Sequence, residues 1–558
     1  AEAAAAADAA ATAAAAAEEA AEAARAAAEA ATVGAEQLVA SGEYDLDAQL
    51  RIAFGAFTST LDPHTQAGFG GHAAANLLHY ETVFARGFDG LARNGGSFDF
   101  EFVDANEKLL LTQNPGWIYH DGRPVTLEEV QFNIERTGGR WAGDPNFVGR
   151  AGNLVGIGDI TMVDATSGKL DMDPPSPGIP NILVRLLLTP QAHVEELGAE
   201  RLANNPIGHG PFKFIDWTQD QVINSTRFDE YRNGRDFEHQ QRLPWVKDLE
   251  SRLFPEEQAR LAALENDEVN IATQIIPDLA ETYADDPDFV VWYHSAQRGL
   301  HIQIPKHLIE DPVNGGPNPW RDLRVRIAAN LAVDQDVLIH NIMTGRENRT
   351  YTLAVGQAGH DGSEGPISDL DWGYDPDRAR ALLAEAGYPD GFDFEIRYPQ
   401  GLYTNVDSFI QAVAGMLTEV GIRTRVEIQE ISQYFSDLRE DATDVLFLFP
   451  QAAGLDPLVS IRENARRDAV FAHRIETLSD PDAFNEIEDY FDAAEAEFDT
   501  DKRNDLLNKG ARRHYEQASW IYLFELVQPQ VARSHLEWRQ FQAKPSFIEF
   551  WNVRARHV

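Results

Sequence analysis

Three histidines lie close together in the segment 62–80, and histidine is the side chain that most often binds transition metals. They are His64, His72 and His79, so successive histidines are separated by steps of 8 and 7 residues. Paired ligands of zinc sites usually lie about two to five residues apart. The Gly-Gly pair before His72 also breaks any regular element that could align the rings. We therefore expect no metal site here.

The chain carries no motif that would supply a catalytic nucleophile or hold a phosphate group. It has no P-loop, no dinucleotide-binding glycine fingerprint and no nucleophile elbow. It contains no cysteine, which excludes disulfides, thiolate catalysis and cysteine-ligated metals, and which suits an exported protein. No Ser, His and Asp set can be assembled from spacing. We expect a protein that is not an enzyme and that uses no cofactor.

A further histidine lies in the turn of the segment 205–217, "NPIGHGPFKFIDW". Gly208, Gly210 and Pro211 surround His209, and alternating aromatic residues follow. Such a composition holds a defined backbone geometry ahead of a strand. We expect the glycines to let the chain reverse, and His209 to be a surface or turn residue rather than a ligand contact.

Alternating strands and helices position these side chains. Apolar runs predict strands over 50–57, 392–399, 444–450 and 520–527, and helical patterns predict helices over 126–137, 324–343 and 375–387. Thr126 and Glu129 have capping-box spacing, and Gly387 ends the last helix. Alternation of this kind along most of the chain indicates α/β lobes.

Length and composition indicate a large globular protein. A chain of 558 residues forms roughly three or four ordinary domains, or two large ones that share segments. Its 43% hydrophobic and 10% aromatic residues are sufficient for a substantial core. No window of about 18 residues is apolar and uncharged, so the sequence predicts no transmembrane helix. No signal peptide is visible and the first residue is not Met, so we expect a mature or trimmed form.

The chain is strongly acidic, with 90 acidic and 47 basic residues and a net charge of −43. Such a charge disfavours nucleic acid and anionic membranes as partners. Two interpretations remain open. The acidic surface serves solubility, or the protein works in a very salty medium where ions screen its self-repulsion.

The first 32 residues are dominated by alanine, and no glycine or proline occurs before Gly34. Alanine has the highest helix propensity, so the sequence predicts one long helix. Residues 1–48 then form a spacer, or an extension whose small side chains let another helix approach closely.

A series of motifs follows in a fixed order along the rest of the chain. They occupy 59–65, 117–136, 205–217, 256–272, 319–339, 374–392 and 518–532. In this order they resemble the large solute-binding proteins of ABC importers for dipeptides and oligopeptides, nickel and oligosaccharides. The resemblance begins near residue 49 and implies a periplasmic-binding-protein-like fold with two α/β lobes, a hinge and a central cleft. It assigns 49–298 to the first lobe, to which 521–558 returns, and 299–520 to the second.

The resemblance also implies which segments line the cleft. They are the loop before Leu61-Asp62-Pro63, the first crossover strand and a loop near the end of the second lobe. The residues so implied are Thr58, Ser59, Thr60, Arg298, His301, Gln303, Phe449, Gln451 and Asp456, with Tyr403 as a further aromatic candidate.

The ligand class stays open. Peptide-binding members pair the ligand's free amine with an Asp three residues before the Asp of a DPD-like turn. Counting back from Asp456 gives Ala453, so this anchor is missing and an unpaired ammonium would be costly to bury. Short peptides are therefore disfavoured. Arg298 and His301 would suit a metal chelate, whereas the aromatic side chains of Tyr403, Phe449 and Trp217 would suit an oligosaccharide.

The resemblance implies an extracytoplasmic receptor, tethered to the membrane or secreted, that delivers its ligand to the permease of an ABC importer. Binding alone is required, without a catalytic group. The alternative is a surface or filament-forming structural protein on the same fold, which self-associates through residues 1–34.

Overall fold

The computed structural model describes residues 42–55, 57, 60–65, 78–87, 91–144, 154, 156–232, 244–304, 315–350, 371–399, 403–430, 433–434, 437–438, 446–450, 456–457, 461, 481–538 and 550–557. The predicted N-terminal helix lies outside these residues and stays a prediction.

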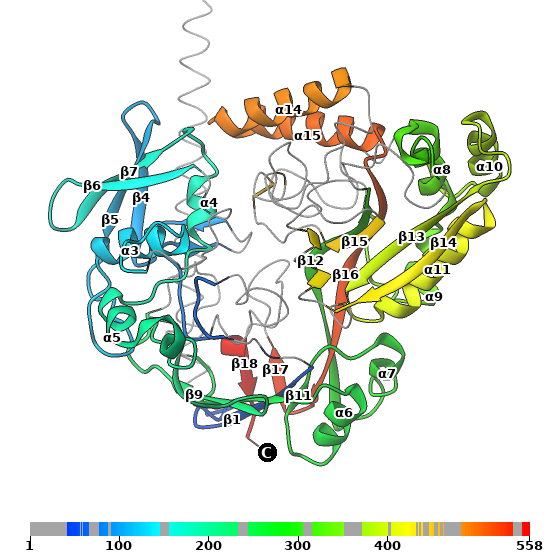
Figure 1. Cartoon of the computed structure of the whole chain (residues 1–558). Helices are drawn as coiled ribbons and strands as arrows, with labels where there is room; N and C mark the ends of the chain where they lie inside the picture. The colour runs from blue at the N-terminus through cyan, green and yellow to red at the C-terminus, as the bar shows by residue number, and fades with distance from the viewer. Residues whose placement is uncertain are drawn as a thin grey trace, which may run out of the picture.

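A ten-stranded mixed sheet runs through the molecule (Figure 1). Its order is β14 (Ile422–Gln429), β13 (Phe392–Pro399), β15 (Leu446–Pro450), β12 (Phe289–Gln303), β16 (Trp520–Arg533), β11 (Ile271–Ala272), β1 (Gln49–Phe54), β10 (Asp248–Leu253), β9 (Val222–Arg227) and β8 (Phe212–Thr218). One end is thus built from residues 392–450 and the other from residues 49–272.

The two long strands β12 and β16 join these ends. They pair antiparallel from Phe289 opposite Arg533 to Gln303 opposite Trp520, with irregular register between Ser295 and His301. At one end of the pair β16 bonds to β11, and at the other end β12 bonds to β15. The chain therefore passes between the two parts of the sheet once in each strand.

A second, four-stranded antiparallel sheet forms a separate layer. Its order is β4 (Phe98–Val103), β5 (Lys108–Gln113), β7 (Ser167–Met172) and β6 (Ile157–Met162). Apolar side chains of this sheet pack with those of α3 (Leu127–Thr137) and α4 (Ile179–Leu183) in one buried cluster, and α5 (Gln191–Leu202) lies beside α3. Figure 1 shows this region at the left of the molecule.

Helices cover both faces of the sheet where β12 and β16 lie beside β13 and β15. The helices are α8 (Leu323–Ala332), α9 (Gln335–Asn341), α10 (Pro376–Glu385), α11 (Val406–Glu419), α14 (Pro481–Ala496) and α15 (Thr500–Glu516). Because side chains alternate along a strand, Ile521 and Leu523 pack toward α8–α11, whereas Trp520 and Tyr522 pack toward α14 and α15.

The remaining elements are short. They are β2 (Ala85–Arg86) paired with β3 (Ala92–Arg93), β17 (Leu536–Trp538) paired with β18 (Val553–Ala555), α6 (Glu257–Glu265) and α7 (Pro277–Glu281), and the 3-10 turns Pro319–Arg321 and Phe550–Asn552. β18 lies near β1, and the two strands share an apolar cluster.

The predicted strand over 392–399 is confirmed with the same bounds as β13, and helices are confirmed at 127–137 and 376–385. The single helix predicted over 324–343 is wrong. Val333 is extended, and the Asp334 carboxylate accepts a hydrogen bond from the Val337 amide at 3.0 Å, so α9 starts anew. The capping box at 126–129 is also wrong, because Thr126 makes no side-chain cap.

Candidate ligand-binding site

The turn around His209 lies in the interior of the protein. The ring of His209 lies 5.9 Å from that of Trp117 and 5.6 Å from that of Tyr119, edge to face, and is 1% exposed. His209 therefore lies in the turn, as expected, but it is not a surface residue. Burial lowers the pKa of His209 to about 4, so its imidazole is neutral.

The two glycines of this turn allow its backbone to lie close to a neighbouring segment of backbone. A Cβ on Gly208 would lie 2.2 Å from the carbonyl oxygen of His79, and a Cβ on Gly210 would lie 2.6 Å from the carbonyl carbon of the same residue. The turn therefore packs its backbone directly on the segment 78–80. This is a different use of glycine from the chain reversal expected from the sequence.

The loop that holds Thr60 is fixed by a buried ion pair. The carboxylate of Asp62 accepts hydrogen bonds of 2.5 and 2.8 Å from the Arg136 guanidinium, and both side chains are at most 1% exposed. Thr60 Oγ1 accepts from the Asp62 amide at 3.1 Å. Thr60 is therefore held against a rigid, charged anchor. Thr58 and Ser59 lie outside the described residues.

The described histidines of the candidate metal site form hydrogen bonds within the protein. His64 donates to the Leu187 carbonyl and accepts from Arg136, both at 2.9 Å. His79 lies 2.9 Å from the Ser225 hydroxyl, and His72 is outside the described residues. Within the part of the chain that the structure describes, no group of three His, Cys, Asp or Glu could hold a metal.

His301 and Gln303 lie in a buried aromatic layer under α15. The His301 ring stacks on Trp520 at 3.7 Å with an interplanar angle of 9°, and the Gln303 amide donates to His301 Nε2 at 2.9 Å. His514 packs edge to face with the same Trp520 ring, and the two ring centroids are 4.7 Å apart. Burial lowers the pKa of His301 well below its usual value, so this ring contributes hydrogen bonding and stacking rather than charge.

Two polar atoms of this layer have no hydrogen-bond partner within the described residues. They are Gln303 Oε1 and His514 Nε2, and both side chains are buried. Buried polar groups normally have a partner in protein or water.

The other predicted residues are only partly placed. Phe449 lies opposite His301 in the β12–β15 register, but only its backbone is described, as for Arg298. Tyr403 is 3% exposed within the apolar cluster beside α11. Gln451 lies outside the described residues, as does Ala453.

Asp456 is buried and paired within the protein. Its carboxylate accepts from Arg503 of α15 at 2.5 Å and from Asn181 of α4 at 2.8 Å, and its side chain is 2% exposed. Sequence reasoning did not single out Asn181 or Arg503. Neither belongs to a motif, and Asn181 is 275 residues from its partner.

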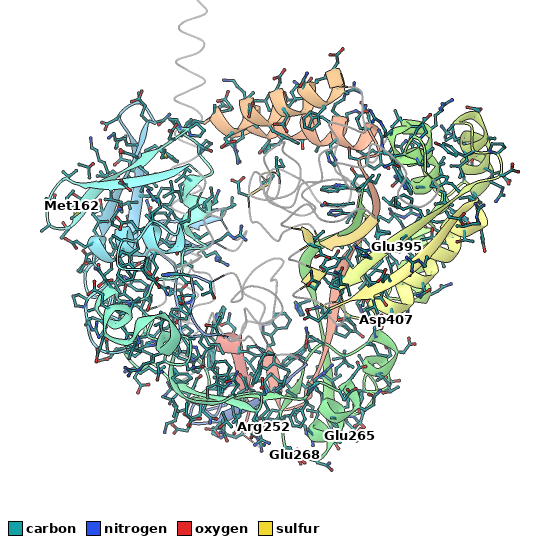
Figure 2. All side chains as sticks on the ribbon, viewed as in Figure 1. Met162, Arg252, Glu265, Glu268, Glu395 and Asp407 are labelled. Atoms are coloured by element: carbon teal, nitrogen blue, oxygen red, sulfur yellow. The ribbon has the colours of Figure 1, made fainter. Side chains whose placement is uncertain are left out.

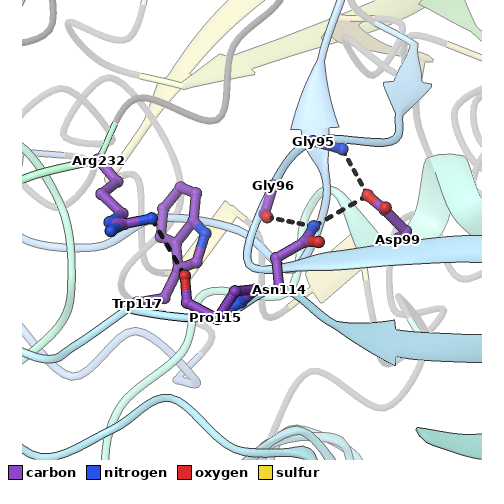
Figure 3. Close-up of a pocket in the computed structure, with 7 residues that line it drawn as sticks. All are labelled: Gly95, Gly96, Asp99, Asn114, Pro115, Trp117 and Arg232. Carbon is purple, nitrogen blue, oxygen red and sulfur yellow. Dashed lines mark hydrogen bonds between the residues drawn. The ribbon is translucent and has the colours of Figure 1, made fainter. Parts of the chain in front are cut away.

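One surface pocket is formed beside β4 and β5 (Figure 3). It has a volume of about 570 Å³ and is lined by Gly95, Gly96, Asp99, Asn114, Pro115, Trp117 and Arg232. The charged side chains that line the pocket already form hydrogen bonds with neighbouring lining residues. Asp99 accepts from the Gly95 amide at 2.6 Å and from Asn114 at 2.9 Å, and Arg232 donates to the Pro115 carbonyl at 3.0 Å. No sequence pattern pointed to it.

A family model for bacterial extracellular solute-binding proteins, family 5, matches residues 106–462, which is more than half of the chain. The chain belongs to this family. The matched range includes β5, β6 and β7 of the four-stranded sheet and runs from β8 to β14 in the ten-stranded sheet, so it covers both ends of the latter.

Curated relatives extend the comparison. A Brucella ovis protein named for peptide binding by an ABC transporter is 27% identical over 322 residues, which are 54% of each chain. The chain thus spans about half the length of the curated relatives that it matches first.

Two solved structures share the fold over nearly the whole chain. The Helicobacter pylori periplasmic binding protein DppA, in complex with the peptide STSA, has a TM-score of 0.73 at 18% identity, over 93% of this chain and all of that one. The Agrobacterium tumefaciens protein AgaA, in complex with agropinic acid, has a TM-score of 0.72 at 20% identity, over 92% and 99%. The two-lobed periplasmic-binding-protein fold expected from the sequence is therefore confirmed.

Proposed function

We propose that the protein is a solute receptor that binds its ligand between two lobes and delivers it to the permease of an ABC importer. Membership of family 5 carries this proposal. The strand pair β12–β16 supports it, because it links two parts of the sheet and has its irregular register between them. Strand irregularities of this kind are where a pair can bend.

The lobe boundaries remain those expected from the sequence, 49–298 with 521–558 for the first lobe and 299–520 for the second. The pairing pattern is compatible with this division. Among the strands that the structure describes in the ten-stranded sheet, those from residues 49–272 and those from residues 392–450 are connected only through β12 and β16. Closure on a ligand would then be a rotation about this pair.

We further propose an amino-acid-derived solute whose binding does not depend on a free amine. Two structural neighbours hold a peptide and agropinic acid. In this chain the carboxylate of Asp456 is buried and already accepts from Arg503 and Asn181. The charge of Asp456 is thus already balanced by the Arg503 guanidinium, so a ligand ammonium would gain less from this carboxylate than from an unpaired one.

Native mass spectrometry of freshly purified protein tests the receptor function. A retained small molecule, released on denaturation, is expected. Absence of any retained molecule, together with no calorimetric binding by peptides, agropinic acid or sugars, would contradict it. Each peptide is titrated alongside its N-acetylated form as the matched control. Sub-micromolar binding that acetylation abolishes would contradict the ligand class alone.

This proposal places the protein outside the cytoplasm, either tethered to the membrane or secreted. Within the described residues, no helix combines the length and apolar character needed to cross a bilayer. The receptor needs no chemistry on its ligand, so we propose no enzymatic activity. Self-association through residues 1–34 also stays a prediction, and the comparisons give the filament alternative no support.

A further inference from the structure

Asp456 forms a bridge between two elements that belong to different apolar cores. On one side is α4, whose Ile179, Ile182 and Leu183 pack with the four-stranded sheet. On the other side is α15, whose Leu507 packs beneath β16. A buried carboxylate that joins two separately packed regions resists their separation, because opening would break its hydrogen bonds.

The hydrogen bonds on both sides of Asp456 are well placed. Asn181 donates through Nδ2 to Asp456 Oδ2 at 2.8 Å, and its Oδ1 accepts from the Ala92 amide at 2.9 Å, which fixes the side chain on its own region. Arg503 donates through Nη2 to Asp456 Oδ1 at 2.5 Å. Each carboxylate oxygen thus accepts from a different region.

A second contact joins the same two regions. The ring of Phe102, on β4, meets the ring of Phe498 edge to face at 5.1 Å, and Phe498 lies in the turn between α14 and α15. Figure 1 shows this pair of helices reaching from the right part of the molecule toward the four-stranded sheet at the left. The contact therefore lies where the two parts approach each other.

We propose that Asn181, Asp456 and Arg503 form an interlobe latch, which stabilises the closed receptor and thereby raises its apparent ligand affinity without touching the ligand. This rests on the proposed receptor function. Binding requires the competent state, so any contact present only on closure sets the fraction of molecules that can bind. These three residues thus act on ligand binding through the relative position of the two lobes.

Asn181→Asp tests the latch sharply. The new carboxylate still accepts from the Ala92 amide, but it loses the donor to Asp456 and adds a like charge at the same place. Asn224→Asp is the matched control. Asn224 also donates to an aspartate, Asp216, at 2.8 Å, but both lie on the β8–β9 hairpin within one region.

The absence of cysteine allows two labels to be placed cleanly. Spin labels at Asp164→Cys, in the β6–β7 turn, and Asp377→Cys, on α10, report the separation of the two parts by pulsed electron resonance in the full chain without added solute. A hydrogen bond to a charged group is worth about tenfold or more in an equilibrium. We expect Asn181→Asp to raise the long-distance population relative to the short one about tenfold, and Asn224→Asp to leave it unchanged.

Phe498→Ala provides a second variant at the same junction, should Asn181→Asp fail to fold. It should shift the distances in the same direction. Distributions that match wild type in the folded variants would overturn the latch. Solute retained by wild type in native mass spectrometry tests the receptor function separately. Unchanged distances with a retained solute would reject the latch alone, whereas shifted distances with no bound solute would reject the receptor alone.

Discussion

The buried pair of Asp62 and Arg136 shows how much a single ion pair can contribute here. Burial alone would raise the pKa of the Asp62 carboxyl, but its hydrogen bond with Arg136 and the charge of that residue lower it below the usual value. The carboxylate is therefore ionised at neutral pH and depends on its partner.

Arg136→Met should lower the free energy of unfolding by roughly 3–5 kcal/mol, because it leaves a buried carboxylate without a counter-charge. Urea unfolding at pH 7 measures this. Arg140→Met is the control, since Arg140 pairs with Asp159 at 3.1 Å with both side chains largely exposed. That pair is screened by water and should contribute at most about 1 kcal/mol. Equal losses in the two variants would contradict the argument.

Buried histidines should make the protein sensitive to mild acid. Burial lowers the pKa to about 3 for His79, His120 and His514, and to about 4 for His209. The unfolded chain binds protons near pH 6.5 while the folded chain does not. The stability that these neutral histidines contribute is therefore fully present above pH 6.5, and it is lost as the pH falls toward 4 and 3. Each histidine contributes a slope of up to about 1.4 kcal/mol per pH unit.

Urea midpoints between pH 7.5 and 4.5 measure this slope. His209→Phe should flatten it by about one proton, since one such imidazole is removed. Stability that stays constant between pH 7 and 5 would show that these rings already bind protons in the folded protein.

Among the elements, strands were predicted well and side-chain contacts poorly. The segment 392–399 matches β13 because its apolar and aromatic residues suit a buried strand in any context. The helix break at Val333 depends on the side chain of Asp334, which caps α9. This cap forms only when the chain bends at that point. The contact of Asn181 with Asp456 joins residues 275 positions apart, so no local pattern can encode it.

Gly210→Ala should destabilise the turn that precedes β8. The added Cβ would lie 2.6 Å from both the carbonyl carbon of His79 and the amide of Tyr80, and neither backbone can move without disturbing its neighbours. Thermal unfolding should show a clear fall in Tm. Gly415→Ala is the control with the opposite sign. Gly415 lies in α11 with nothing within 4 Å, so alanine should stabilise by roughly 0.5–1 kcal/mol. An unchanged Tm for Gly210→Ala would contradict the close-approach argument.

Across the whole molecule, the excess of acidic residues should make stability depend on ionic strength. The net charge is −43, and exposed acidic side chains such as Glu265 and Glu268 lie on the outer surface near α6 (Figure 2). Salt screens such repulsion, with a Debye length that falls from about 30 Å at 0.01 M to about 10 Å at 0.1 M. The Tm should rise steeply over this range of KCl, and equally in NaCl. A Tm independent of ionic strength would mean that self-repulsion is negligible.

The position of β16 in the ten-stranded sheet has a consequence for biosynthesis. β16 is formed by residues 520–533, near the end of the chain, yet it lies between β12 and β11 in the middle of the sheet. A nascent chain that has emerged only to residue 510 holds every other strand of that sheet, but not the one that joins its halves. Domains usually fold in order as synthesis proceeds from the N-terminus. Here the central sheet can be completed only after residues 520–533 have been synthesised, so its two parts remain unjoined until β16 emerges.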